Sequence, residues 1–274
     1  KISKAFEITK NKSKRIRNIE MVQKDEKTVR VIVSLKKDID YDIVNVFGRN
    51  KSVIEIGDRS SDIYRQLAWE AKNLEKKAPA LKPVKLVPRF KGTLAGKTII
   101  LDPGHGGDDP GALSPSGIPE KTLTLQTARA AAKLFRRAGA TVYLTRDEDR
   151  RSSLSDVVGF ANKSGADLLI SIHYNSTHSA RISGTETYYY NPKSREFAEK
   201  MHEAIIRGIK RKDRGLHRTP FYVIKNVSLP SVLLEPVYLT CPDENELAKT
   251  ASFQEEVAHD ILSGVKEYFR NKFR

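Results

Sequence analysis

Apolar residues in the C-terminal two thirds of the chain follow two alternating patterns. Short continuous apolar runs are typical of strands that are buried on both faces. Between them lie longer segments whose apolar residues recur at helical spacing. The predicted strands are 98–101, 141–145, 167–173, 185–190 and 231–235, and the predicted helices are 120–138, 154–164, 194–210 and 251–269.

This alternation of strands and helices predicts an α/β fold. A strand, a helix and a second strand in succession favour parallel pairing, because the helix carries the chain back across the sheet. We therefore expect a largely parallel, twisted sheet that is covered by helices on both faces.

The N-terminal third has a different pattern. Residues 28–35 alternate well enough for a half-buried strand, and 41–46 and 53–56 are shorter strand candidates. These strands predict a small, basic, β-rich domain over residues 1–60.

A helix and a proline-bearing stretch follow this small domain. Residues 62–77 have apolar side chains at helical spacing, and residues 78–91 carry three prolines among lysines and small residues. Such a composition predicts a semi-rigid linker. The expected organisation is therefore a β-rich domain at 1–60, a helix and linker at 61–96, and a larger domain at 97–274.

The positive charge of the chain is concentrated near its N-terminus. Residues 1–97 contain 24 Lys and Arg against 12 Asp and Glu, a net charge of +12 out of +15 for the whole chain. Nucleic acid, anionic lipid and an acidic wall polymer are all partners of suitable charge. The basic stretch 10–17 lacks the interleaved aromatic residues of a nucleic-acid site, so we expect no nucleic acid partner.

The composition excludes several further classes of protein. No apolar run approaches the roughly 18 residues of a membrane span, so no transmembrane segment is expected. The chain begins at Lys1 and shows no secretory leader, which is compatible with a leader that was removed or never included. Cys241 is the only cysteine, which excludes an intrachain disulfide and a cysteine-rich zinc site.

Two histidines occupy the same kind of position in the predicted sheet. His105 follows the strand 98–101 in a glycine-rich turn, and His173 ends the strand 167–173. Because open α/β sheets place their ligand crevices at the carboxyl ends of strands, the two side chains can converge on one ion. Glu120, which opens the next helix, adds a carboxylate. A His-Glu-His set with an open position is the ligand pattern of hydrolytic zinc sites.

A second acid lies at the end of another apolar strand. Glu235 directly follows the apolar run 231–234, where a buried charge is costly unless it has a function. Beside a metal site, this carboxylate can take the proton of an attacking water and later pass it to a leaving amine. These residues together indicate metal-assisted hydrolysis of an amide.

Short motifs surround these residues in a fixed order along the chain. They read Leu-Asp-Pro-Gly-His-Gly-Gly at 101–107, Asp-Pro-Gly-Ala at 109–112, Leu-Thr-Arg-Asp at 144–147, Ser-Ile-His at 171–173, Gly-Thr-Glu-Thr-Tyr at 184–188 and Leu-Pro-Ser-Val-Leu-Leu-Glu at 229–235. The series covers about residues 97–270 and resembles the zinc-dependent N-acetylmuramoyl-L-alanine amidases of the amidase_3 type.

The resemblance implies a role for each of the four residues. His105, Glu120 and His173 match the zinc ligands of that family, and Glu235 matches its catalytic acid. Its members cut the amide between N-acetylmuramic acid and L-alanine in peptidoglycan, which implies an enzyme of wall remodelling or cell separation. The implied location is the cell envelope, in the periplasm or outside the cell.

The remaining regions resemble known families less closely or depart from them. The first domain is faintly similar to the AMIN domain, which implies contact of the basic region with an anionic wall polymer or a regulator. Two parts of the larger domain, Tyr174 and residues 236–240, depart from the amidase pattern. Separately, we interpret residues 210–212 together with Arg214 as a solvated charge cluster. Two alternatives stay open: a catalytically weak peptidoglycan-binding protein, and a zinc peptidase that cuts within the stem peptide.

Overall fold

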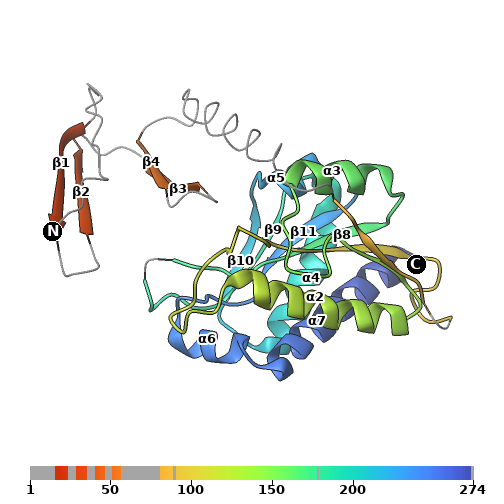
Figure 1. The fold of residues 1–274 in the computed structure, drawn as a ribbon. Helices are drawn as coiled ribbons and strands as arrows, with labels where there is room; N and C mark the ends of the chain where they lie inside the picture. The colour runs from red at the N-terminus through yellow and green to blue at the C-terminus, as the bar shows by residue number, and fades with distance from the viewer. Residues whose placement is uncertain are drawn as a thin grey trace. The chain divides into compact units, whose positions relative to one another are not determined.

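The computed structural model describes residues 16–23, 29–35, 41–46, 51–56, 81–88, 91–177 and 179–272. The chain divides into two compact units, residues 1–74 and 75–274, which are described separately below (Figure 1). The predicted helix at 62–77 and part of the predicted linker lie outside the described residues.

The described part of the first unit consists of two antiparallel strand pairs. β1 (Ile16–Gln23) pairs with β2 (Val29–Leu35), and β3 (Tyr41–Val46) pairs with β4 (Lys51–Ile56). Three of these strands, β2, β3 and β4, coincide with predicted ones, whereas β1 was not predicted.

The second unit contains a mixed sheet of seven strands in the order β10-β9-β11-β8-β6-β7-β5. Its four central strands β7, β6, β8 and β11 are parallel, as predicted, while β5, β9 and β10 run in the opposite direction. The strands are β5 Val84–Leu86, β6 Thr98–Pro103, β7 Thr141–Leu144, β8 Leu168–Ile172, β9 Thr185–Tyr189, β10 Asp213–Arg218 and β11 Ser231–Glu235. β5 belongs to the sheet although its residues fall within the predicted linker.

Helices cover both faces of this sheet, as predicted (Figure 1). Successive residues of a strand point to opposite faces, so a continuous apolar run serves two cores. In β6, Ile99 and Leu101 pack into the core with α2, α4 and α7, whereas Ile100 packs with α3 and α5. The helices are α2 Glu120–Arg137, α3 Leu154–Lys163, α4 Arg195–Ile209 preceded by the 3-10 turn η1 Pro192–Ser194, α5 Tyr222–Asn226, α6 Pro242–Ala248 and α7 Ala251–Lys272. Of the helices within the described ranges, none has both the length and the hydropathy to cross a bilayer.

Candidate metal centre and active site

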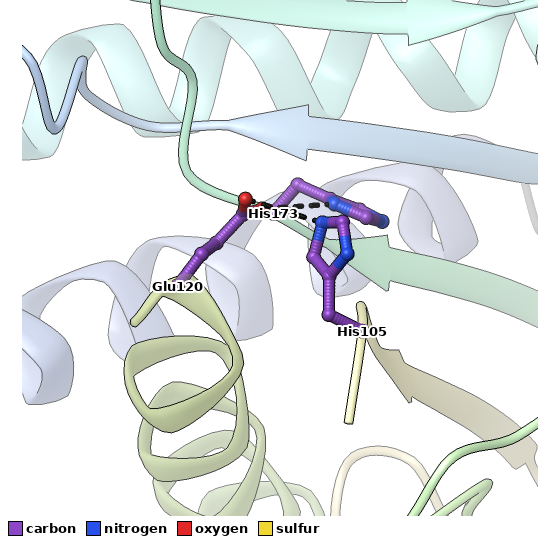
Figure 2. Close-up of side chains that lie close together, drawn as sticks. All are labelled: His105, Glu120 and His173. Carbon is purple, nitrogen blue, oxygen red and sulfur yellow. Dashed lines mark hydrogen bonds and ion pairs between the residues drawn. The ribbon is translucent and has the colours of Figure 1, made fainter. Parts of the chain in front are cut away.

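Three of the predicted site residues come from neighbouring parallel strands. His105 follows β6, His173 follows β8, and Glu235 is the last residue of β11. These strands lie side by side in the order β11-β8-β6, so their carboxyl ends meet at one edge of the sheet. Glu120, the first residue of α2, reaches the same edge from the helix that follows the glycine-rich turn (Figure 2).

The carboxylate of Glu120 bridges the two imidazole rings. Its Oε1 lies 3.0 Å from His173 Nδ1, and its Oε2 lies 3.1 Å from His105 Nε2. The ring centroids of the two histidines are 4.9 Å apart and nearly perpendicular. One ligand atom from each of the three residues lies within 4.8 Å of the others, and Figure 2 shows the three side chains converging.

Glycines allow the backbone to pass this close to the cluster. A Cβ on Gly104 would lie 2.2 Å from the ring of His173. A Cβ on Gly111 would lie 2.6 Å from Glu120 Oε2, and its φ of 66° is in the left-handed region that favours glycine. His105 itself has a φ of 63°, a conformation that costs a non-glycine residue roughly 1–2 kcal/mol.

Backbone donors and the two histidines fix Glu120 as an anion. Its Oε2 accepts a hydrogen bond from Ala112 N at 2.9 Å, and its Oε1 accepts one from Tyr174 N at 3.0 Å. Burial opposes ionisation, but His105 and His173 outweigh it and hold the pKa of Glu120 well below its usual range. A buried carboxylate in this position needs positive charge beside it.

The charge of Glu120 favours positive charge on His105. Burial disfavours the charged ring, but Glu120 and then Asp109 outweigh burial and raise the pKa of His105 from 6.5 to about 10. A divalent cation also supplies positive charge, and the nitrogen and oxygen atoms of the three side chains are suitable ligands for it. The donor set and its charge therefore fit a metal ion such as zinc.

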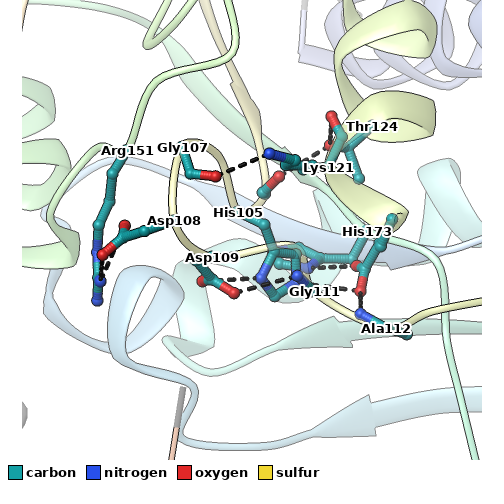
Figure 3. Close-up of polar contacts among 12 residues, drawn as sticks. His105, Gly107, Asp108, Asp109, Gly111, Ala112, Lys121, Thr124, Arg151 and His173 are labelled. Carbon is teal, nitrogen blue, oxygen red and sulfur yellow. Dashed lines mark hydrogen bonds and ion pairs between the residues drawn. The ribbon is translucent and has the colours of Figure 1, made fainter. Parts of the chain in front are cut away.

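Asp109, which was not among the predicted site residues, orients the first histidine. Its Oδ2 lies 3.0 Å from His105 Nδ1, and its Oδ1 accepts a hydrogen bond from Gly111 N at 3.1 Å (Figure 3). A histidine ligand commonly donates its second ring nitrogen to a carboxylate, which fixes the ring and its tautomer. The sequence feature that could have indicated this role is the position of Asp109, four residues after His105 and beyond a pair of glycines.

Side chains beyond the cluster tie down the glycine-rich turn. Lys121 Nζ donates to Gly107 O at 2.7 Å and pairs with Asp149 Oδ2 at 2.7 Å. Arg151 Nη1 pairs with Asp108 at 3.2 Å (Figure 3). The turn that carries His105 is thus held at several points.

Glu235 is held differently from Glu120. Its Oε2 is inaccessible to solvent and has no hydrogen-bond partner among the described residues. Burial, and then the negative charge of Glu120, raise the pKa of Glu235 well above its usual value. This carboxyl group is therefore poised to hold a proton beside the metal cluster.

A third carboxylate, Glu186, lies directly opposite Glu235 in the register of β9 and β11. Directly paired residues of antiparallel strands place their side chains on the same face. Unlike Glu235, Glu186 has its oxygens saturated by donors, which lower its pKa although burial opposes this. The donors are Tyr238 Oη at 2.8 Å, Arg214 Nε at 3.2 Å, Asn175 Nδ2 at 2.8 Å and Tyr188 Oη.

Arg214, which was interpreted as part of a solvated charge cluster, also takes part in this network. It is partly exposed, pairs with Glu186 and lies over the ring of Tyr238 at 5.5 Å. Tyr238 belongs to the segment 236–240 that departs from the amidase pattern, and its hydroxyl group is a donor to Glu186. Tyr174, the other departure, is buried and its hydroxyl group bonds with Thr127 at 2.7 Å.

Comparison with known families identifies the second unit. The Amidase_3 family, described as N-acetylmuramoyl-L-alanine amidase, matches residues 99–267. The chain belongs to this family. The predicted family and fold class are therefore confirmed.

Similar Amidase_3 proteins come from several bacteria. The amidase LytC of Bacillus subtilis is 34% identical over 190 residues, which are 68% of this chain and 38% of LytC. The probable cell wall amidase LytH of Staphylococcus aureus is 32% identical over 220 residues, which are 79% of this chain and 71% of LytH. This chain thus matches little more than a third of the length of LytC.

Solved structures of this family have the same fold. The catalytic domain of CwlV, an amidase from Bacillus (Paenibacillus) polymyxa var. colistinus, is 35% identical with a TM-score of 0.62. The match covers 64% of this chain and 98% of the CwlV domain. An N-acetylmuramoyl-L-alanine amidase from Clostridium difficile 630 is 34% identical with a TM-score of 0.63, over 65% of this chain and 99% of that structure.

Proposed function

We propose that this protein hydrolyses the amide bond between N-acetylmuramic acid and L-alanine in peptidoglycan, with zinc as cofactor. The observation that carries the proposal is the cluster of His105, Glu120 and His173, whose ligand atoms lie within 4.8 Å of one another. Membership of the Amidase_3 family and the activity named for its relatives support the substrate class.

Each part of the cluster has a defined task in this proposal. His105, Glu120 and His173 hold the ion, and Asp109 fixes the ring of His105 through Nδ1. When bound, zinc lowers the pKa of a water ligand and polarises a carbonyl group. Glu120 is locked by two backbone donors, so it stays in place when the ion exchanges.

Glu235 moves the proton. It takes a proton from the water whose oxygen attacks the lactyl carbonyl carbon, and it returns that proton to the alanine nitrogen as the C–N bond breaks. A raised pKa suits this role, because the ionised carboxylate is then a stronger base toward water and the protonated group is the acid that the leaving nitrogen needs. Glu186, which keeps its charge, lies alongside and disfavours ionisation of Glu235.

The same proposal includes the setting of the reaction. The substrate class places the protein in the cell envelope, in the periplasm or outside the cell. We propose that residues 1–60 form an AMIN-like module whose charge contacts an anionic wall polymer or a regulator, that 61–96 link it, and that 97–274 catalyse. The net charge of +12 on residues 1–97, which include both the module and the linker, supports contact with an anionic partner.

Product identification tests the function directly. The full chain is incubated with purified sacculi, and the released products are analysed by mass spectrometry. The expected products are stem peptides with a free N-terminal L-alanine, and they should disappear with EDTA or in Glu235→Gln. Peptides cut internally would instead identify a zinc peptidase. Binding to sacculi without release would identify a wall-binding protein, and full activity of Glu235→Gln would refute the assigned role of the acid.

A further inference from the structure

Arg146 is the largest fully buried side chain of the described residues, and the metal cluster does not include it. It follows β7, and its guanidinium group has five acceptors within hydrogen-bond distance, three of which share the two N–H groups of Nη2; none of the five is a carboxylate. The acceptors are Pro103 O at 3.0 Å, Gly104 O at 2.9 Å, Lys121 O at 2.9 Å, Thr124 Oγ1 at 3.0 Å and Glu148 O at 3.3 Å.

Four of the five acceptors lie on the two segments that carry the first two proposed ligands, and the fifth, Glu148 O, lies two residues after Arg146 itself. Pro103 and Gly104 immediately precede His105, and Lys121 and Thr124 form the first turn of α2 after Glu120. Thr124 Oγ1 adds a direct bond between the segments, because it donates to Gly104 O at 2.8 Å. One planar group therefore holds the turn before His105 against the helix start that bears Glu120.

Burying the charged side chain of Arg146 at this position costs free energy. Burial lowers the pKa of Arg146, which means that the charged group is disfavoured where it lies. The charges of Asp102, Asp149 and Asp109 favour the ionised group, but no ion pair of Arg146 with a carboxylate is found among the described residues. An apolar side chain of similar volume is often neutral or better for stability than a buried charge. The planar fork directs N–H groups on separate nitrogen atoms at carbonyl groups on two segments. An apolar residue has no such donors, and the compact, flexible ammonium of lysine does not reproduce this fixed geometry.

The positive charge does not itself favour a metal ion, because like charges repel. Any benefit of Arg146 to the site must therefore be geometric. Arg146 fixes the distance between the backbone before His105 and the backbone after Glu120. The side chains of these two residues lie close together, with His105 Nε2 3.1 Å from Glu120 Oε2.

We propose that Arg146 is a positioning residue that holds His105 and Glu120 at ligand spacing before the ion arrives. The proposal rests on the proposed function in assigning zinc to the cluster. It predicts that loss of the guanidinium group weakens metal binding more than it destabilises the fold. Residues that orient metal ligands without binding the metal typically contribute about 10–100-fold to metal affinity.

The experiment compares Arg146→Lys with the wild-type full chain. Zinc affinity is measured by competition with a chromophoric chelator, and ligand geometry by the visible spectrum of the cobalt-loaded protein. We expect the affinity of Arg146→Lys to fall about 10–100-fold and its cobalt spectrum to change. The control is Arg129→Lys on the exposed side of α2, where Arg129 pairs with Asp147; its affinity and spectrum should equal those of the wild type.

A measurement on the metal-free protein separates this inference from the zinc assignment. The ring nitrogen signals of His105 in NMR spectra should shift in Arg146→Lys, whereas those of His202, which Thr187 and Asp213 hold elsewhere, should not. If the wild type binds no zinc, the proposed cofactor is wrong and the His105 signals alone decide the role of Arg146.

A milder variant keeps the test decisive if Arg146→Lys fails to fold. Thr124→Val removes the hydroxyl that Arg146 and Gly104 share while keeping the shape of the side chain. It should lower zinc affinity several-fold and shift the His105 signals. Wild-type affinity and unchanged His105 signals in a folded variant, even with a lower unfolding midpoint, would overturn the proposal and leave Arg146 with a purely structural role.

Discussion

Replacing Glu235 by glutamine is expected to abolish catalysis and yet to stabilise the metal-free protein at neutral pH. Burial, and then Glu120, raise the pKa of Glu235 well above its ordinary value of 4.5. When the pKa of a carboxyl group is higher in the folded protein than in the unfolded one, the group contributes fully to stability at pH values below its unfolded-state pKa. That contribution is lost as the pH rises through the pKa of the folded protein. The wild type is therefore penalised at neutral pH, and Glu235→Gln is not.

The size of the stabilisation expected for Glu235→Gln depends on the cost of burying Glu235 Oε2 without a hydrogen-bond partner. Oε2 of Glu235 is inaccessible and has no partner among the described residues. A buried polar group without a partner costs about 1–3 kcal/mol, and a charged one costs more. We expect Glu235→Gln to gain about 1–2 kcal/mol over the wild type at pH 8 and little at pH 4. For a domain of this size the gain raises Tm by roughly 5 °C.

Glu186, which lies opposite Glu235 on the neighbouring strand, provides a matched control. Its replacement by glutamine should change the free energy of unfolding at pH 8 in the opposite direction. Burial opposes its ionisation, but hydrogen bonds from Tyr188, Tyr238 and Arg214 lower its pKa. Its contribution to stability is present above the ordinary pKa of 4.5 and is lost as the pH falls through the lowered value. Glu186→Gln should therefore be less stable than the wild type at pH 8, with the difference shrinking toward pH 4.

Urea unfolding in EDTA checks both predictions on three proteins. The free energies of unfolding of the wild type and the two variants are compared between pH 4 and pH 8. The reasoning is refuted if both variants shift stability in the same direction at pH 8. It is also refuted if the advantage of Glu235→Gln does not shrink on acidification.

Three further predictions concern the metal cluster. Asp109→Asn should lower zinc affinity by about 10–100-fold in chelator competition, because it weakens the partner of His105 Nδ1; unchanged affinity would contradict this role. Removing zinc with EDTA should lower the stability of the wild type by about 2.7 kcal/mol when free zinc had been 100 times its Kd, and an unchanged Tm would count against binding. Gly111→Ala should reduce both zinc affinity and stability, since its Cβ would lie 2.6 Å from Glu120 Oε2; a variant with wild-type values for both would show that the turn relaxes freely.

The elements that carry the site were predictable because their patterns are local. β6 and β8 are buried along nearly their whole length, and their sequences are largely apolar. α2 begins at the residue predicted. By contrast, β10 reads Asp-Arg-Gly-Leu-His-Arg and lies at the sheet edge, where pairing with β9 rather than apolar alternation makes it a strand. β5 is three residues long and likewise depends on its neighbour β7.

The missing parts of the site were those that depend on long-range register. The sequence motif that contains Glu186 was recognised, but nothing in it reveals that β9 runs antiparallel to β11 and brings Glu186 opposite Glu235. Arg146 stood in a recognised motif as well, yet its acceptors come from two other segments of the chain. Sequence periodicity reports which face of an element is buried, and it does not report which distant polar group shares that face.

The order of strands in the sheet has a consequence for the newly synthesised chain. β8 and β9 follow each other along the chain but are not neighbours, because β11 lies between them. Until β11 has been synthesised, the strands form two separate groups whose facing edges are unpaired, and such edges favour aggregation. The three proposed ligands are present at that stage, but Glu235, the last residue of β11, is not. A chain released early is therefore expected to be a target for degradation, and we expect the proposed hydrolytic activity only from a chain that includes β11, the strand that closes the centre of the sheet.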